Sequence, residues 1–181
     1  MMTTRQAKLF SAGAHAACGQ KYGAYWYSEH LDDVADTLAE FRFVGDKYET
    51  TAYLHDVIED TVIDRPALVY YGVPLVVVGA VEFCTDEYGS NRRVRKRLTY
   101  ERVRKQIQTG GEAVRIGVAV KWADRISNLR HCLLTDSKLL SMYKNEQKAA
   151  DDFMAAYMPE DAEADTRWAP VFKKYAQLLT T

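Results

Sequence analysis

The chain has 181 residues, of which 48% are hydrophobic and 27% are charged, and its formal net charge is -1 at pH 7. This length suffices for one well-buried core, so we expect a single domain over residues 1–181. No apolar run approaches the roughly 18 residues of a membrane span, and the N-terminus lacks the pattern of a signal peptide, which predicts a cytoplasmic protein without a membrane partner. The near-neutral charge argues against nucleic acid as a partner.

The cysteines are few and far apart in the sequence. Their number is odd, and apolar residues surround each of them, namely Cys18, Cys84 and Cys132. This pattern indicates neither a disulfide framework nor a zinc cluster, and it predicts buried free thiols.

Apolar residues at helical spacing predict a first helix from Thr4 to about Tyr22, which Thr3 or Thr4 can cap. His15 falls near the polar edge of this helix, where a histidine is more often packed or solvated than a ligand. An aromatic-rich loop follows at residues 23–27. Such a loop usually anchors itself on the core, but it also suits a wall for a planar ligand.

A second helix is predicted from its N-cap at Ser28 to about Phe41, with His30 in the first turn. The third helix is predicted over residues 46–61 or 50–61, and it contains an unusual density of polar side chains within an apolar pattern. These residues are the centre of the sequence argument.

On one continuous helix, His55 and Glu59 would share one ridge. Asp56 and Asp60 would share the adjacent ridge. Three carboxylates so close together are costly unless a cation or a proton relieves them. A divalent metal held by His55 and Asp56, with the other two carboxylates beside it to handle water, satisfies this requirement.

Two shorter helices are expected next. Residues 64–66 predict a cap with proline in the first turn, and Gly72 ends this helix. Pro74 precedes an apolar run at 75–83 that reads as a helix or as a buried strand, and its helical neighbours favour helix.

A strongly basic segment follows a polar loop that contains Gly89. It carries eight basic residues, Arg92, Arg93, Arg95, Lys96, Arg97, Arg102, Arg104 and Lys105. Two interpretations are equally supported: a solvated helix face, or a rim that attracts phosphate groups. A nucleic-acid surface is a weaker third interpretation.

Gly110 and Gly111 precede a long apolar segment at residues 113–134, within which Asp124 and Asn128 lie four residues apart. A carboxylate in such a helix needs a partner. Asp124 is therefore either paired with Lys121 or Arg125 or a metal ligand, and this segment alone favours the salt bridge.

The C-terminal part, residues 136–181, predicts two further helices. Thr135 or Asp136 caps a helix over about 137–157, which Pro159 stops, and a final amphipathic helix carries Trp168. Taken together, these segments predict an all-α, single-domain bundle of about eight or nine helices with little or no strand.

The order of the polar residues, a histidine, then a His-Asp pair, then a later aspartate, resembles the HD superfamily of metal-dependent phosphohydrolases. More narrowly, residues 54–61 (LHDVIEDT), 71–73 (YGV) and 120–130 (VKWADRISNLR) resemble the hydrolase domain of the RelA/SpoT proteins and its stand-alone relatives, the small alarmone hydrolases. The core motifs span residues 15–135. This family removes the 3′-pyrophosphate from the alarmone (p)ppGpp.

The resemblance implies an HD-type fold and one divalent ion, Mn²⁺ in the family, with the ligands His30, His55, Asp56 and Asp124. A ligand set of nitrogen and oxygen without thiolate agrees with Mn²⁺. Glu59 and Asp60 match the acidic pair that orients and deprotonates the attacking water, and the products would be GDP or GTP and pyrophosphate.

The resemblance also suggests substrate contacts. Asn128 matches a residue that contacts the nucleotide sugar, and an amide suits a ribose because it both donates and accepts. Lys21 corresponds, less securely, to a basic position that meets the base or the phosphates. The basic segment at 92–105 corresponds to a basic segment of the family, which favours the phosphate rim.

The sequence departs from the family at two places. Leu31 follows His30 where the family usually has proline, which binds no metal and leaves the ligand assignment intact. The loop at 23–27 is shorter and more aromatic than the Gly-x-Pro-Tyr loop of the family, which puts the identity of the substrate base in doubt.

Other functions stay open at this point. The same centre could hydrolyse another phosphorylated nucleotide, such as an adenine alarmone or NADPH. A non-catalytic protein that binds a nucleotide or neutralises a toxin by contact is a third hypothesis, against which the intact pair Glu59 and Asp60 argues. Pairing with an alarmone synthetase or toxin, and assembly into a homo-oligomer, are compatible with every residue named.

Overall fold

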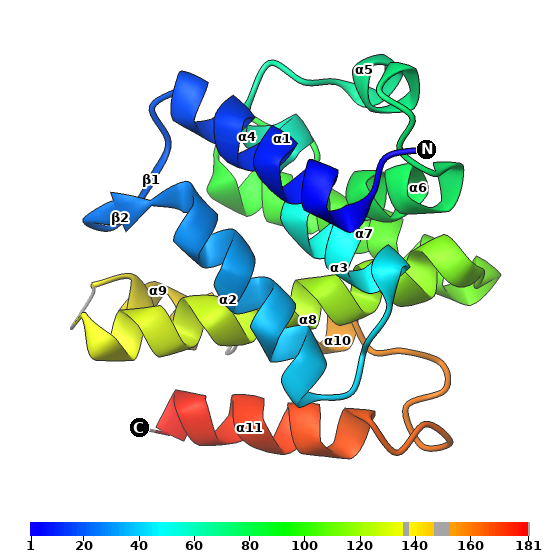
Figure 1. Cartoon of the computed structure of the whole chain (residues 1–181). Helices are drawn as coiled ribbons and strands as arrows, with labels where there is room; N and C mark the ends of the chain where they lie inside the picture. The colour runs from blue at the N-terminus through cyan, green and yellow to red at the C-terminus, as the bar shows by residue number, and fades with distance from the viewer. Residues whose placement is uncertain (136–137, 147–152, 181) are drawn as a thin grey trace.

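The computed structural model describes residues 1–135, 138–146 and 153–180, and over these residues the fold is almost entirely helical (Figure 1). The prediction of an all-α bundle is confirmed. The described residues form eleven helices and one antiparallel hairpin, in the order α1 (Thr4–Ala17), β1 (Lys21–Tyr22), β2 (Tyr25–Trp26), α2 (Tyr27–Glu40), α3 (Asp46–Leu54), α4 (Val57–Asp60), α5 (Arg65–Tyr70), α6 (Leu75–Cys84), α7 (Arg92–Thr109), α8 (Glu112–Leu134), α9 (Leu139–Glu146), α10 (Phe153–Ala156) and α11 (Trp168–Thr180). No helix in this part of the chain is long and apolar enough to cross a membrane.

Helix α8 runs through the middle of the molecule, with α11 on one side and the N-terminal helices on the other (Figure 1). Every residue from Ile116 to Ala123 is buried. A helix that is apolar around its whole circumference needs neighbours on all sides, and α8 packs against α2, α3, α6 and α11. Trp122, which is 1% exposed, also ties α8 to the C-terminal part by donating from Nε1 to the carbonyl of Tyr157 at 2.9 Å.

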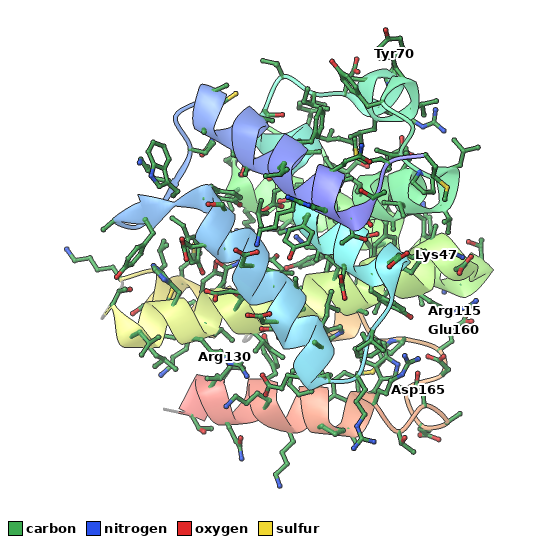
Figure 2. The ribbon with its side chains drawn as sticks, in the orientation of Figure 1. Lys47, Tyr70, Arg115, Arg130, Glu160 and Asp165 are labelled. Atoms are coloured by element: carbon green, nitrogen blue, oxygen red, sulfur yellow. The ribbon has the colours of Figure 1, made fainter. Side chains whose placement is uncertain are left out.

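Two ion pairs join α8 to its neighbours near its two ends, and Figure 2 labels the basic residue of each, Lys47 and Arg130. Lys47 Nζ lies 2.7 Å from Glu112 Oε1 at the first turn of α8, and Arg130 Nη2 lies 2.7 Å from Glu40 Oε2 near the end of α2. Exposed pairs of this kind contribute at most about 1 kcal/mol each, so the buried face of α8 holds it in place.

Several predicted helix starts are confirmed. Thr3 forms a capping box with Gln6 at the start of α1, and Asp64 Oδ1 accepts from the Ala67 N–H at 2.9 Å at the start of α5. The apolar run after Pro74 is the helix α6 and not a strand.

The N-terminal prediction needs two corrections. Helix α1 ends at Ala17 and does not reach Tyr22, because Gly19 turns the chain with φ of 70° and Tyr22 then pairs with Tyr25 in the hairpin. Ser28 is not the cap of α2, since that helix begins one residue earlier without a side-chain cap.

The predicted continuous third helix is also wrong. Helix α3 ends at Leu54, α4 begins at Val57, and Asp56 between them has φ -104° and ψ 0°. On an unbroken helix the side chains of His55 and Asp56 would diverge by about 100°. The break instead brings His55 Nε2 within 2.9 Å of Asp56 Oδ2, so both side chains reach one point.

The C-terminal part agrees only partly with the prediction. The expected helix over 137–157 contains two helices, α9 and α10, and residues 147–152 between them and the expected cap Asp136 lie outside the described residues. Thr135 ends α8, and the expected final helix that carries Trp168 is α11, which begins at this residue.

The three cysteines are free thiols, as predicted, but only two of them are buried. Cys84 and Cys132 lie in the interior, whereas Cys18 is exposed because it follows the last turn of α1.

The close crossing of α6 and α8 provides a test of the packing. A Cβ on Gly117 would lie 2.5 Å from Phe83 Cδ1, whereas one on Gly13 of α1 would meet nothing within 4 Å. Gly117→Ala should lower the free energy of unfolding by roughly 1–3 kcal/mol through overpacking. Gly13→Ala should raise it by roughly 0.5–1 kcal/mol, because alanine favours an exposed helix. Urea denaturation measures both, and equal effects of the two substitutions would contradict the close crossing.

Candidate metal centre and pocket

The four predicted metal ligands come together in space from three parts of the fold. His30 lies in the first turns of α2, His55 and Asp56 occupy the break between α3 and α4, and Asp124 lies in α8. His30 Nε2 is 3.4 Å from Asp124 Oδ1 and 3.8 Å from Asp56 Oδ2. His55 Nε2 is 2.9 Å from Asp56 Oδ2 and 3.9 Å from Asp124 Oδ1.

These distances fit a single small cation. Donor atoms bound at about 2.1 Å to a six-coordinate ion lie about 3 Å apart when adjacent and about 4.2 Å apart when opposite. The four distances between imidazole nitrogens and carboxylate oxygens fall within or very close to that range. Two nitrogens and two oxygens without thiolate suit a divalent ion such as Mn²⁺.

The hydrogen bonds of the two imidazoles turn the Nε2 atoms toward this point. His55 Nδ1 lies 2.8 Å from the carbonyl of Ala52, which can accept only from a protonated nitrogen. His30 Nδ1 lies 3.5 Å from Ser127 Oγ. His55 Nε2 is buried without a well-directed hydrogen bond in the described structure, and such an unsatisfied atom fits a metal ligand.

The charges at this point compensate one another. Burial alone would raise the pKa of both aspartates, but His55 beside Asp56 and Lys121 beside Asp124 hold these pKa values below the usual range. Burial lowers the pKa of His55, and the Asp56 carboxylate overrides it and raises that pKa to about 9. Both carboxylates are therefore anionic at neutral pH.

The surroundings of Asp124 are compatible with both interpretations of the sequence at once. Lys121 Nζ lies 3.1 Å from Oδ2, and Oδ1 faces the two imidazoles. The salt bridge to Lys121 and the ligand position are on different oxygens of the same carboxylate.

The predicted acidic pair lies on α4, beside the cluster of ligands. Glu59 Oε2 accepts from the Asp86 N–H at 3.2 Å, and burial raises the pKa of Glu59. Burial and the neighbouring carboxylates of Asp56 and Glu59 raise the pKa of Asp60 to about 6. A carboxylate with such a pKa can accept a proton near neutral pH more effectively than an ordinary aspartate.

A pocket of about 690 Å³, including the part open to solvent, lies against this cluster. Its wall combines carboxylates, cations and aromatic rings, namely Tyr27, Asp56, Glu59, Asp60, Asp86, Arg92, Lys96, Tyr100, Lys121, Asp124, Arg125, Asn128, Tyr143, Phe153 and Tyr157. The four cations make the pocket suitable for a phosphorylated ligand in spite of its acidic floor.

The basic residues of α7 lie on different faces, and each of the two interpretations agrees with one of these faces. Arg92 and Lys96 line the pocket, as a phosphate rim requires. Arg93, Arg97 and Lys105 are exposed, as a solvated face requires.

The two predicted substrate residues differ in position. Asn128 lines the pocket and donates from Nδ2 to Asp124 Oδ1. Lys21 lies on the hairpin outside the pocket lining, with Nζ 2.9 Å from the centre of the Trp26 ring.

Three residues of the site were not predicted from the sequence. Tyr27 donates to Asp56 Oδ2 at 2.5 Å, and Tyr22 donates to Asn128 Oδ1 at 3.1 Å. His15 is fully buried and stacks on Tyr27, with ring centres 4.5 Å apart. The aromatic cluster at 22–27 was the available signal, but it did not indicate which rings point inward.

The comparison with known proteins finds similarity at the level of structure. No family model and no curated protein sequence match the chain. Among solved structures, it is similar to one described as a metazoan ortholog of SpoT that hydrolyses ppGpp and plays a role in starvation responses. The similarity covers 94% of each chain, with a TM-score of 0.70 and 21% sequence identity.

The chain has the fold of this SpoT ortholog. The resemblance to the RelA/SpoT hydrolase domain is thereby confirmed at the level of the fold. At 21% identity the chemistry of this SpoT-like fold has to be argued from its own residues.

A metal-binding measurement tests the ligand cluster, with one histidine as the matched control. His30→Gln should weaken Mn²⁺ binding by more than roughly 100-fold, beyond the effect of losing an outer hydrogen-bond partner. His131→Gln should weaken binding far less, because His131 contacts the ring of Tyr22 and the ligand cluster does not include it. Isothermal titration of the metal-free protein gives both affinities, and an equal loss in the two variants would contradict the assignment.

Proposed function

We propose that this protein is a Mn²⁺-dependent hydrolase that removes the 3′-pyrophosphate of (p)ppGpp and releases GDP or GTP and pyrophosphate. The main support is the cluster of His30, His55 and Asp56, whose ligand atoms lie within 4.8 Å of one another, with Asp124 Oδ1 at 3.4 and 3.9 Å from the two imidazoles. Glu59 and Asp60 lie beside this cluster and line the same cation-lined pocket. The description of the similar SpoT ortholog as a ppGpp hydrolase agrees with this proposal.

The chemistry requires an activated water, a proton acceptor and compensation of the phosphate charge. A divalent ion held by His30, His55, Asp56 and Asp124 would polarise the phosphoryl group and lower the pKa of water. Glu59 and Asp60 orient the water, and one of them accepts its proton as the water oxygen bonds to the phosphorus on the 3′ oxygen. The bond from this phosphorus to the 3′ oxygen breaks, and the 3′ oxygen takes up a proton.

The remaining residues of the pocket bind and orient the substrate. Arg92, Lys96 and Lys121 place positive charge along the wall, where the phosphate oxygens of the nucleotide would lie. Asn128 keeps one donor and one acceptor beyond its bonds to Tyr22 and Asp124, which leaves it able to contact a ribose hydroxyl.

The position of Lys21 favours a second candidate within the same reaction class. Its ammonium lies over the ring of Trp26 outside the pocket lining, and Tyr25 and Trp26 beside it are exposed, so this loop offers a different surface to the base of a nucleotide than the family's loop would. Another phosphorylated nucleotide, such as an adenine alarmone or NADPH, is therefore the alternative substrate.

Release of pyrophosphate from ppGpp tests the reaction and the roles of the residues. Glu59→Gln and Asp60→Asn should each lower kcat by roughly 10²–10⁴-fold while Mn²⁺ binding persists, because the pair acts on the proton. Asp56→Ala should abolish both activity and metal binding. Glu82→Gln, on the exposed face of α6, serves as the matched control and should retain full activity.

A nucleotide panel separates the substrates. Turnover of ppGpp with Mn²⁺ that stops with chelator supports the proposal. Strong turnover of an adenine nucleotide without turnover of ppGpp would replace the substrate, and metal binding without turnover of any nucleotide would favour a binding protein.

The raised pKa of Asp60 predicts the acid side of the pH profile. The proton acceptor works only as the carboxylate, and its pKa is raised to about 6, so the carboxylate form is lost as the pH falls through about 6. With Mn²⁺ kept saturating, kcat should rise with pH and then level off, with a midpoint at or below about 6 because the bound cation offsets the charge of Asp56. A kcat that is unchanged down to pH 4.5 would exclude Asp60 as the acceptor.

A further inference from the structure

Two tyrosines of the hairpin region flank the imidazole of His30. Tyr22 belongs to β1 and Tyr27 begins α2, and their ring centres lie 4.6 and 5.3 Å from that of His30. Both side chains are half-buried, and both hydroxyls point at residues of the ligand cluster or its immediate neighbour.

Tyr27 contacts the carboxylate of Asp56 directly. Its hydroxyl donates to Asp56 Oδ2 at 2.5 Å, and the same oxygen faces His55 Nε2 at 2.9 Å. A carboxylate oxygen accepts at two positions. The phenol occupies one of them and leaves the other directed at the point between the imidazoles.

Tyr22 is connected to the carboxylate of Asp124 through the side chain of Asn128. Its hydroxyl donates to Asn128 Oδ1 at 3.1 Å, and Asn128 Nδ2 donates to Asp124 Oδ1, the oxygen that faces His30. Since Lys121 holds the other oxygen of Asp124, the carboxylate has a partner on each side.

Each phenol is itself held by a histidine that is not a ligand. His15 is stacked on Tyr27 with an interplanar angle of 11°, and His15 Nδ1 lies 2.8 Å from the carbonyl of Ser11. The ring of His131 lies 4.0 Å from that of Tyr22. All four histidines of the chain thus join one cluster of rings around the two tyrosines.

We propose that Tyr22 and Tyr27 are positioning residues that aim the carboxylates of Asp124 and Asp56 at the metal. This inference rests on the proposed metal centre and adds to it the residues that orient its ligands. Hydrogen-bonded outer partners of this kind fix the geometry of a ligand and raise metal affinity.

Substitutions that remove only the hydroxyl groups test the proposal. Tyr27→Phe and Tyr22→Phe should each weaken Mn²⁺ binding by roughly 10–100-fold, as measured by titration of the metal-free protein. Tyr25→Phe is the matched control from the same hairpin, because Tyr25 is 60% exposed and should leave the affinity unchanged. The losses in the Tyr22→Phe/Tyr27→Phe double variant should multiply, since each hydroxyl acts on a different carboxylate.

A double-mutant cycle tests the role of His15. His15→Ala removes the stacked ring and should weaken Mn²⁺ binding, whereas His15→Phe keeps a flat ring on Tyr27 and should restore most of the affinity. In the Tyr27→Phe background, His15→Ala should have little further effect, because its influence passes through the phenol.

The possible outcomes distinguish the positioning role of the two tyrosines from the existence of the metal centre. A wild-type protein that binds no Mn²⁺ would overturn both. A wild-type protein that binds Mn²⁺, with Tyr→Phe variants that bind it equally tightly, would overturn the positioning role alone. Thermal unfolding in chelator provides the structural control, since a role in packing alone would lower the melting temperature and leave the Mn²⁺ affinity of the folded protein unchanged.

Discussion

The structure depends on two carboxylates, Asp56 and Asp124, that are largely buried against the same two imidazoles. A buried charge without a partner costs several kcal/mol, so each carboxylate needs compensation from a defined direction. Lys121 supplies it for Asp124 at 3.1 Å, and His55 supplies it for Asp56 at 2.9 Å. A divalent cation bound by the two imidazoles and these carboxylates would take the place of the proton on His55 and compensate both carboxylates at once.

This constraint accounts for the least regular part of the fold. A continuous helix would direct His55 and Asp56 about 100° apart, and the break between α3 and α4 removes that divergence. The same break places α4 so that Glu59 and Asp60 line the pocket. Helix α8 approaches the two imidazoles from the core of the molecule. Because α8 is packed on all sides there, the position of Asp124 is fixed.

Helical periodicity is a local signal, and it predicted the all-α fold, which the structure confirms. The four proposed ligands and the acidic pair came from the resemblance to the HD superfamily, and the structure brings these side chains close together. The contact of Tyr22 with Asn128 joins positions 106 residues apart, so no local pattern reports it. The break at Asp56 was missed for the same reason, because tertiary contacts overrode a sequence that is compatible with one helix.

The hairpin divides its aromatic residues between two tasks. Tyr22 and Tyr27 reach inward to residues of the ligand cluster, whereas Tyr25 and Trp26 are 60% and 56% exposed. Tyr22 pairs with Tyr25, and Lys21 pairs with Trp26, and of these four paired residues only Tyr22 is partly buried. Because Tyr25 and Trp26 make no contact that orients a proposed metal ligand in the described structure, these two positions can change without disturbing the proposed metal centre. The departure of this loop from the family pattern is thus compatible with an intact ligand geometry, and it falls on residues exposed to solvent.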